Sequence, residues 1–415
     1  MRSLFKIALR NLRRYTRRTL LTSLLIVVGV VMVLLFSGLA GSFKSTMIGL
    51  ITDSGLGHMQ IHRRGFVASI DSLPLNLNMS PEGYAKVLQT LEAEPEILAS
   101  APRIKLGGML SNYMDTTSVR ISAVDPDREL AVSPGLSGRL IQPLINASLL
   151  APGQVIIPER LARGLNIEPG QNVVLVATNR DGSVNGGQFE VVNLIEDVLG
   201  PQGRDAYMHI DDARTLLRMD QQEVTEVILR VRDFQRLDRV AAALESKLAG
   251  FTTSQGAPAF ELHTWAKLSP FANIANMIDV LTITVKIVMI AIVLISVLNV
   301  MLMSVFERVR EIGTMSAMGT APRTILGLFV IEGGLLGLFG SMLGAGLGLA
   351  ALAAIKAAEV SISFARMDNL VLRPSIDPWE VAAILGIVVL VAVLAALQPA
   401  WKASRMDPVQ ALGHV

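Results

Sequence analysis

Four long apolar stretches constrain this chain more than any other feature of its sequence. They cover residues 20–40, 280–306, 325–355 and 381–400. A helix that crosses a bilayer needs about 20 mostly apolar residues, so each stretch is long enough to span one. Charged residues make up 17% of the chain, whereas an ordinary soluble domain carries about 25%. The sequence therefore predicts a four-span membrane protein that also carries a water-soluble part.

The distribution of lysine and arginine predicts the orientation of these spans. Residues 1–19 are rich in arginine and contain no acidic residue, and basic residues recur in the 305–324 loop and after residue 401. Positive charge close to a span marks its cytoplasmic end. We therefore expect both termini in the cytoplasm and the large segment 42–272 on the other side of the membrane.

The first residues form a basic amphipathic pattern. Residues 4–18 place apolar residues on one helical face and arginines on the other. This pattern predicts a helix that lies in the membrane interface and leads into the first span. A plain topology signal without interfacial binding explains the same charges equally well.

The segment 42–272 shows the patterns of an α+β domain. Ser80 followed by proline is a typical helix start, with serine as the cap. Residues 155–178 predict a strand, a short helix, a turn and a second strand, with Gly170 in the turn. Alternating apolar residues predict further strands, and the segments 211–218 and 234–248 predict helices.

No catalytic motif emerges from the sequence. There is no cysteine, no G-x-S-x-G elbow and no phosphate-binding G-x-x-x-x-G-K-[ST] loop. His58 and His62 lie four residues apart on a predicted strand, without the glutamate of a zinc-protease helix, so we expect no metal site. The net charge of +2 gives no general field for nucleic acid. We expect no catalytic residue and no cofactor in this chain, so any ATP must bind to another chain.

The third apolar stretch carries two sets of glycines with four-residue spacing. Residues at this spacing share one helix face, and small residues let membrane helices approach closely. One interpretation is a sliding interface between subunits or bundles, and the other is static packing within this chain. The two sets are Gly333 and Gly337, followed by Gly340, Gly344 and Gly348.

Glu332 lies within the same stretch, where an unpaired carboxylate is costly. Asn299 and Glu332 are each seven residues from the intervening 307–324 connection, so antiparallel helices place them at one depth. We therefore expect a hydrogen bond between them. Alternatively, Glu332 lines the lateral cavity of a dimer. Lys286 lies farther out, and we expect its amine to reach the outer surface.

Several motifs resemble one family of bacterial ABC transporter permeases. Residues 307–348 contain REIG, then MG, then an arginine before a glycine-rich span, and residues 399–412 read PAWKASRMDPVQAL. Together with the start ALRNLRRYTRRTLLTSLLIVVGV at residues 8–30, they resemble the FtsX-like, MacB-type permeases. The passages at 55–66 and 121–129 make the LolC/LolE lipoprotein-releasing permeases the nearest group within this family.

This resemblance implies a coupling helix that docks on an ATPase. Four charged residues would make salt bridges to the ATPase, and three apolar residues would fill a groove on it, with two glycines between them. The implied coupling residues are Glu307, Arg308, Arg310, Glu311, Ile312, Gly313, Met315, Met318 and Gly319. ATP and Mg²⁺ would bind to the ATPase and not to this chain.

The resemblance also implies partners and a location. These partners are an ABC ATPase subunit, a second permease copy or sister permease, membrane lipids, and also lipoprotein cargo and a periplasmic carrier. The location would be the bacterial inner membrane, with a MacB-like α+β periplasmic domain inserted between transmembrane helices 1 and 2. The expected domains are 1–41 with the first span, 42–272 outside the cytoplasm, and 273–415 with spans two to four.

Three functions follow from this resemblance. The first is release of lipoproteins from the inner membrane, driven by a separate ATPase. The second is MacB-like efflux, in which the outer domain transmits mechanical work. The third is an FtsX-like signalling scaffold that controls an extracytoplasmic hydrolase.

A loop at 197–207, with a Gly-Pro-Gln-Gly tip, is either a partner contact or a plain connecting turn.

Overall fold

The computed structural model describes residues 2–14, 16–144, 148–197, 205–219, 222–253, 255–364, 367–371 and 374–407. The chain forms two compact units. The helical unit comprises Met1–Thr46 and Asn276–Val415, and the sheet unit comprises Met47–Ala275. Along the sequence, the sheet unit therefore lies between the first long helix and the second.

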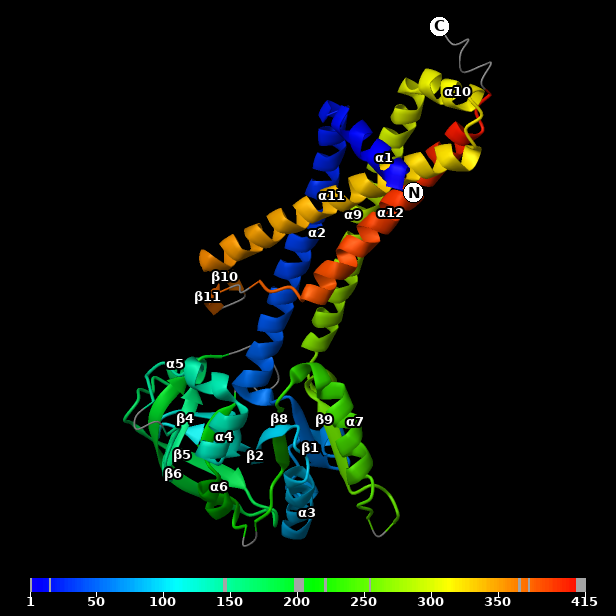
Figure 1. Cartoon of the computed structure of the whole chain (residues 1–415). Helices are drawn as coiled ribbons and strands as arrows, with labels where there is room; N and C mark the ends of the chain where they lie inside the picture. Colours follow the sequence, from blue (N-terminus) through cyan, green and yellow to red (C-terminus); the bar gives the residue numbers. More distant parts are fainter. Residues whose placement is uncertain are drawn as a thin grey trace. The chain divides into compact units, whose positions relative to one another are not determined.

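The helical unit is built from long helices that follow the apolar stretches (Figure 1). Four of the helices among the described residues are long and apolar enough to cross a membrane, as the sequence predicted. A short hairpin precedes the last helix. The elements are α1 (Arg2–Arg14), α2 (Thr16–Ile51), α9 (Phe271–Glu307), α10 (Val309–Ala317), α11 (Pro322–Ala357), β10 (Ser361–Phe364), β11 (Met367–Val371) and α12 (Pro378–Ser404).

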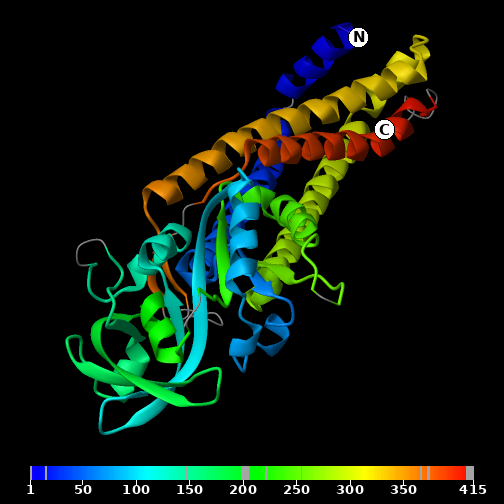
Figure 2. The same ribbon diagram turned by 90° about the horizontal axis from the view of Figure 1, so that it is seen from below.

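The core of the helical unit consists of aliphatic and small side chains from all four long helices. Ile26 and Leu34 of α2, Val297 of α9, Leu335 of α11 and Ala392 of α12 are all buried in it. Helices α11 and α12 lie side by side in both views (Figures 1 and 2). Helix α9 is the least buried of the four and leaves many large apolar side chains exposed.

The sheet unit combines nine strands with short helices. The strands are β1 (Met59–Arg63), β2 (Ile97–Ser111), β3 (Thr116–Val124), β4 (Gln154–Pro158), β5 (Asn172–Thr178), β6 (Val184–Ile195), β7 (Ala206–His209), β8 (Glu226–Val231) and β9 (Phe260–Thr264). The helices are α3 (Pro81–Glu92), α4 (Pro126–Val132), α5 (Glu159–Gly164), α6 (Ile210–Leu217), α7 (Leu237–Leu248) and α8 (Trp265–Leu268). Single turns of other helical types cover Thr52–Leu56, Val67–Ser69, Leu75–Leu77, Pro134–Arg139 and Phe234–Arg236.

The long strand β2 joins two halves of this sheet. The strand order is β3-β7-β4-β6-β5-β2-β8-β1-β9, and a further β3–β2 pairing closes the first six strands into a ring. The first half of β2 pairs with β8, from Ile97↔Val231 to Arg103↔Glu226. Its second half pairs with β3 and β5. Figure 2 shows β2 as the long cyan strand that runs through both halves.

Each half has its own hydrophobic core. One core packs α3 and α7 on β1, β8 and β9, with Met59, Val87, Leu229 and Leu244 fully buried or nearly so. The other fills the ring of strands and includes Leu110. The two cores meet along β2, so residues in the middle of this strand belong to the junction between the halves.

Several local expectations in this unit are confirmed. Ser80 caps α3, and its side chain accepts a hydrogen bond from the Gly83 N–H. Gly170 has φ +91, as the predicted turn requires. Strands β2, β7 and β9 and helix α4 were not predicted, although the five residues of β9 alternate between buried and partly buried positions.

Candidate functional site

The predicted coupling segment forms a separate short helix, α10. Helix α9 ends at Glu307, and Arg308 adopts a non-helical backbone with φ −112 and ψ 16 before α10 begins. At the other end, Gly319 has φ +83, and the Thr320 N–H reaches the Met315 carbonyl at 3.0 Å. Glycine ends helices readily in this left-handed conformation. The sequence thus bends the chain on both sides of α10.

One face of α10 packs against the ends of the long helices. Ile312 is completely buried, and Met315 packs beside it in a small core. The other members of this core are Val305, Ile325, Phe329, Ala400 and Ala403. The expectation that Ile312 fills a groove on a partner is therefore wrong: its side chain anchors α10 within its own chain. Gly313 is also buried.

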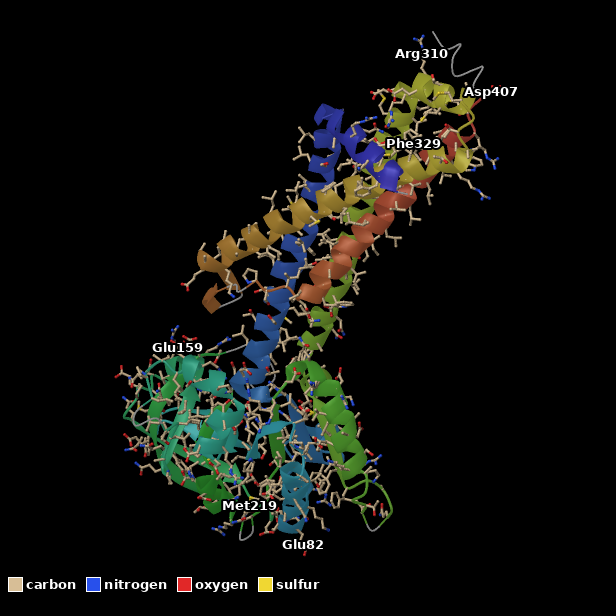
Figure 3. All side chains as sticks on the ribbon, in the orientation of Figure 1. Glu82, Glu159, Met219, Arg310, Phe329 and Asp407 are labelled. Atoms are coloured by element: carbon tan, nitrogen blue, oxygen red, sulfur yellow. The ribbon has the colours of Figure 1, made fainter. Side chains whose placement is uncertain are left out.

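The opposite face of α10 is exposed. Glu307, Arg310 and Glu311 are exposed there, and Gly319 is exposed at the end of the helix. Met318, directly after α10, is 73% exposed. Figure 3 shows Arg310 pointing away from the helices, whereas Phe329 lies among them. This face combines charge with an accessible methionine, a composition that suits protein recognition.

Arg308 does not belong to this exposed face. Its side chain is 5% exposed, and its Nη1 donates to Glu332 Oε2 at 3.1 Å. Its Nε donates to Glu311 Oε2 at 3.0 Å, and the guanidinium lies 5.3 Å from the centre of the Phe329 ring. The expectation that Arg308 contacts a partner is wrong, because the bend after α9 turns this side chain inward.

The predicted pairing of Glu332 with Asn299 is also wrong. Asn299 is exposed on α9, whereas the Glu332 carboxylate is buried against Arg308. The helical spacing gave both residues the same depth but not the same direction around the helix axis. A flexible arginine beyond the end of the span reaches back to the carboxylate instead.

The five glycines of α11 all pack against helices of the same chain. A Cβ on Gly333 would come within 2.5 Å of the Ala396 Cβ in α12. The second set faces α2: a Cβ on Gly340, Gly344 or Gly348 would come within 2.9 Å of a side chain there. Close packing within the chain, one of the two open interpretations, therefore occupies both glycine faces.

Two ion pairs join α9 to other helices nearer its first residues. Lys286 Nζ donates to Glu380 Oε1 of α12 at 2.6 Å. Lys44 Nζ of α2 donates to Asp279 Oδ2 at 2.5 Å. Lys286 was expected to reach the outer surface, and the structure pairs it with Glu380, which lies just before the fourth apolar stretch.

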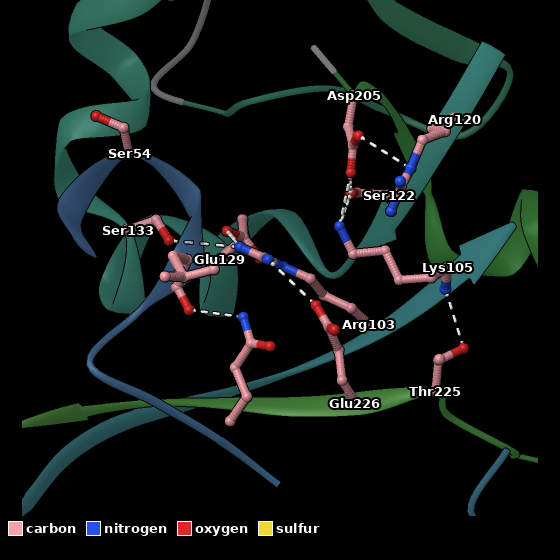
Figure 4. Close-up of polar contacts among 12 residues, drawn as sticks. Ser54, Arg103, Lys105, Arg120, Ser122, Glu129, Ser133, Asp205, Thr225 and Glu226 are labelled. Atoms are coloured by element: carbon pink, nitrogen blue, oxygen red, sulfur yellow. Dashed lines mark hydrogen bonds and ion pairs between the residues drawn. The ribbon is translucent and has the colours of Figure 1, made fainter. Parts of the chain in front are cut away.

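The sheet unit holds a buried polar network that the sequence analysis missed (Figure 4). Arg103 of β2 is completely buried and donates to both carboxylate oxygens of Glu129 and, at 3.3 Å, to Glu226. Two positions along, Lys105 donates to Asp205 at 2.7 Å. Burial alone would raise the pKa of Glu226, but Lys105, the hydrogen bond from His62 and Arg103 lower it to about 2.

This network marks the junction of the two halves of the sheet. Arg103 and Lys105 lie in β2, Glu129 in α4, Glu226 in β8 and Asp205 directly before β7. The signal in the sequence was the pair Arg103 and Lys105, two cations two residues apart in an apolar strand. Charges on one face of a buried strand need opposite charges nearby.

His58 and His62 lie in separate surroundings. His62 lies 3.3 Å from Glu226, whereas His58 lies against the edge of the Phe234 ring. Within the described part of the chain, no three His, Cys, Asp or Glu side chains gather as metal ligands. Of the 197–207 loop, residues 198–204, including the Gly-Pro-Gln-Gly tip, lie outside the described residues.

Two family models cover most of the chain. The MacB-like periplasmic core domain matches residues 19–247, which is more than half of the chain. The FtsX-like permease C-terminal model matches residues 283–408 and so includes the whole of α10, α11 and α12. The candidate coupling helix therefore lies within the part that this second model describes.

Similar proteins carry names from several transport systems. The macrolide export ATP-binding/permease protein MacB of Hahella chejuensis is 26% identical, over 99% of this chain and 60% of its own length. The lipoprotein-releasing system transmembrane protein LolC of Neisseria meningitidis is 24% identical, over 80% of this chain and 81% of its own. The pyoverdine export ATP-binding/permease protein PvdT of Pseudomonas putida is 28% identical, over 64% and 38%.

Among solved structures, the periplasmic region of MacB from Actinobacillus actinomycetemcomitans covers 57% of this chain and 98% of its own. Its sequence identity is 14% and its TM-score 0.37, so the family models carry the assignment. Relative to the MacB protein of Hahella chejuensis, the chain spans about 60% of the length. The match of both family models shows that this chain belongs to the FtsX-like permeases of ABC transporters that carry a MacB-like periplasmic core domain.

Proposed function

We propose that this chain couples ATP hydrolysis by a separate ATPase subunit to conformational work in its sheet unit. In this proposal the chain lies in a bacterial inner membrane with both termini and α10 in the cytoplasm. The sheet unit lies on the periplasmic side. ATP and Mg²⁺ bind to the ATPase, and the permease supplies the docking helix and the moving part.

The exposed face of α10 is the observation that carries this proposal. Its outward residues, Arg310, Glu311 and Met318, form a small mixed surface, while Ile312 holds the opposite face in the chain's own core. A helix fixed on one side and open on the other can receive a push from a docked protein. A solvated loop that only sets topology would not need a buried anchor of this kind.

For the cargo, we propose a lipoprotein. The similarity to LolC extends over about four fifths of both chains, and the name of that relative states lipoprotein release. Each CH₂ of a buried acyl chain contributes about 0.8 kcal/mol to membrane anchoring, so a multiply acylated protein is held firmly. Its extraction therefore needs an external energy source, which the ATPase would supply, and a periplasmic carrier to receive the acyl chains.

A second candidate function is export of a small molecule through a MacB-like assembly. The similarity to the MacB protein of Hahella chejuensis extends over nearly the whole of this chain and favours this candidate. In that case the sheet unit would transmit force to an adaptor instead of delivering a lipoprotein to a carrier.

We further propose that α9 faces a second permease copy or a sister permease. Many of its apolar side chains are exposed, among them Ile283, Ile287 and Ile295. Both glycine faces of α11 are already occupied by α2 and α12. The free apolar helix surface in the described part of this unit is thus largest on α9, which leaves it as the natural contact for another span.

The test is reconstitution of the full chain in nanodiscs with an ABC ATPase that co-purifies with it. We expect stimulated ATP hydrolysis and ATP-dependent release of a triacylated lipoprotein. The same lipoprotein without its acyl chains serves as control for non-specific binding. Stimulation by an adaptor protein, without lipoprotein release, would instead support export. No association with any ABC ATPase would contradict both proposals.

A further inference from the structure

We propose that Arg308 is the positioning residue that makes the docking helix α10 and the membrane helix α11 move as one body. This inference rests on the proposed function, because it concerns how a push on α10 reaches the spans. The residue touches neither ATP nor cargo, and it acts through the helices that its side chain joins.

The backbone at Arg308 is the point at which α10 can rotate relative to α9. Its non-helical φ and ψ interrupt what would otherwise be one helix from α9 into α10. The Ile312 N–H bonds to the Arg308 carbonyl at 2.9 Å, so α10 starts directly from this residue. A force that the docked ATPase exerts on α10 can therefore rotate α10 about Arg308, unless a side chain connects α10 to another helix.

The Arg308 side chain connects α10 to α11. One guanidinium bonds to Glu311 within α10 and to Glu332 in the first third of α11. Its flat face lies over the ring of Phe329, also in α11. Three contacts in different directions fix the planar guanidinium, which a single point charge would not be able to do.

The buried surroundings of Arg308 and Glu332 strengthen this connection between α10 and α11. Arg308 and Glu332 are both at least nine-tenths buried, beside the small apolar core around Ile312 and Phe329. In such a place an ion pair is weakly screened by water, and separating the two charges leaves each of them without solvent. The pair therefore opposes independent motion of α10 more strongly than a surface pair would.

Helix α11 passes the motion on. Gly333, the residue after Glu332, packs against Ala396 of α12, and Gly337 packs against Ala392 one turn later. Tightly packed interiors are hardly compressible, so a displacement of one helix is transmitted to the helix in contact with it. A push received by α10 would thus move α11 and α12 together.

The decisive measurement is the distance between α10 and α11 during the ATP cycle. The chain has no cysteine of its own, so spin labels can be placed at Ala317→Cys at the end of α10 and at Leu343→Cys in α11, two exposed positions that are not among the residues assigned to ATPase docking. In the full chain with its ATPase, we expect the same distance distribution with and without ATP and Mg²⁺. In Arg308→Lys, which cannot bridge both carboxylates, we expect ATP to broaden or shift it.

Transport gives the second readout. We expect Arg308→Lys and Glu332→Gln to bind the ATPase and keep stimulated hydrolysis, while cargo released per ATP falls about tenfold, within the range reported for coupling mutations. Cargo released per ATP should fall less in Glu332→Gln than in Arg308→Lys, because the glutamine amide oxygen still accepts a hydrogen bond from Arg308. Lys286→Gln is the matched control: it breaks a different ion pair of α9, distant from α10, and should leave the label distance unchanged.

The possible outcomes separate this inference from the proposed function. If no ATPase associates with the unsubstituted chain, the proposed function is wrong. If association and hydrolysis are normal but the α10–α11 distance in the unsubstituted chain changes with ATP, the inference is wrong. It is equally wrong if Arg308→Lys and Glu332→Gln keep both the distance and the cargo yield of the unsubstituted chain.

Discussion

Gly337 of α11 lies so close to Ala392 of α12 that a methyl group on the glycine would come within 2.5 Å of the alanine Cβ. Real carbon atoms do not approach one another so closely, and the backbone of α12 lies directly behind, with the Val388 carbonyl 3.7 Å from the same point. The absence of a side chain at residue 337 therefore sets the distance between these two helices.

The first prediction follows from this contact. Gly337→Ala should lower the free energy of unfolding by about 1–3 kcal/mol, the usual cost of overpacking. Gly346→Ala is the matched control, because a Cβ at this position of the same helix meets no atom within 4 Å. Unfolding of both variants in detergent measures the difference. Equal stability of the two variants would contradict the close contact.

The second prediction concerns the exposed face of α10. Arg310→Glu combined with Met318→Asp should abolish binding of the ATPase, because it reverses one charge and removes the accessible apolar side chain. Glu311 is left intact, since its carboxylate also holds Arg308. Co-purification and stimulated hydrolysis measure the effect.

The control for this surface is Arg239→Glu, the same charge reversal at an exposed position of the sheet unit. It should leave binding of the ATPase unchanged. If the α10 double variant still stimulates the ATPase like the original chain, α10 is not the docking surface.

The third prediction concerns the buried network of the sheet unit. Arg103→Leu leaves Glu129 and Glu226 buried without the guanidinium that bonds both of them. Removing one partner from a buried ion cluster costs about 3–5 kcal/mol. We expect this loss in the free energy of unfolding, whereas Arg239→Leu, at an exposed position, should change it little. A loss as small as that of the control would show that the network contributes little to joining the halves.

The fourth prediction is a pH dependence that arises from His58. The pKa of this histidine is lowered from 6.5 to about 4, chiefly by burial and also by the positive charge of Arg230, while Asp53 opposes the shift. The neutral ring also accepts a hydrogen bond at Nδ1 from the Val231 N–H at 3.2 Å. Protonation of Nδ1 would remove this bond and place a charge in a buried site.

The sign of the effect follows from the lowered pKa. Between pH 6.5 and 4 the unfolded chain binds a proton that the folded chain excludes, so stability falls as the pH falls through this range. The shift corresponds to roughly 3 kcal/mol at most, which is fully lost below about pH 4. His58→Asn keeps an acceptor near Nδ1 but does not titrate, so its free energy of unfolding should fall less steeply. If the free energy of unfolding depends on pH in the same way for the original chain and for His58→Asn, His58 is not the source of the pH dependence.

Much of the helical unit could be predicted because its signals are local. A run of twenty apolar residues spans a bilayer whatever surrounds it, and the four long helices follow those runs. The bends around α10 were also local, since Gly319 and Pro322 mark the end of one helix and the start of the next. The glycine spacing likewise identified two packing faces on α11.

What the sequence by itself determined, then, was the number of spans, the α+β character of the inserted unit and the family. Only the tertiary structure decided which helix fills each glycine face, that Arg308 and not Asn299 meets Glu332, and that Arg103 joins the halves of the sheet. These contacts unite segments far apart in the chain. They depend on how each helix is rotated about its axis and on where a flexible side chain finds a buried partner. Hydrophobic periodicity specifies an element and its buried face, but it does not specify the partner across that face.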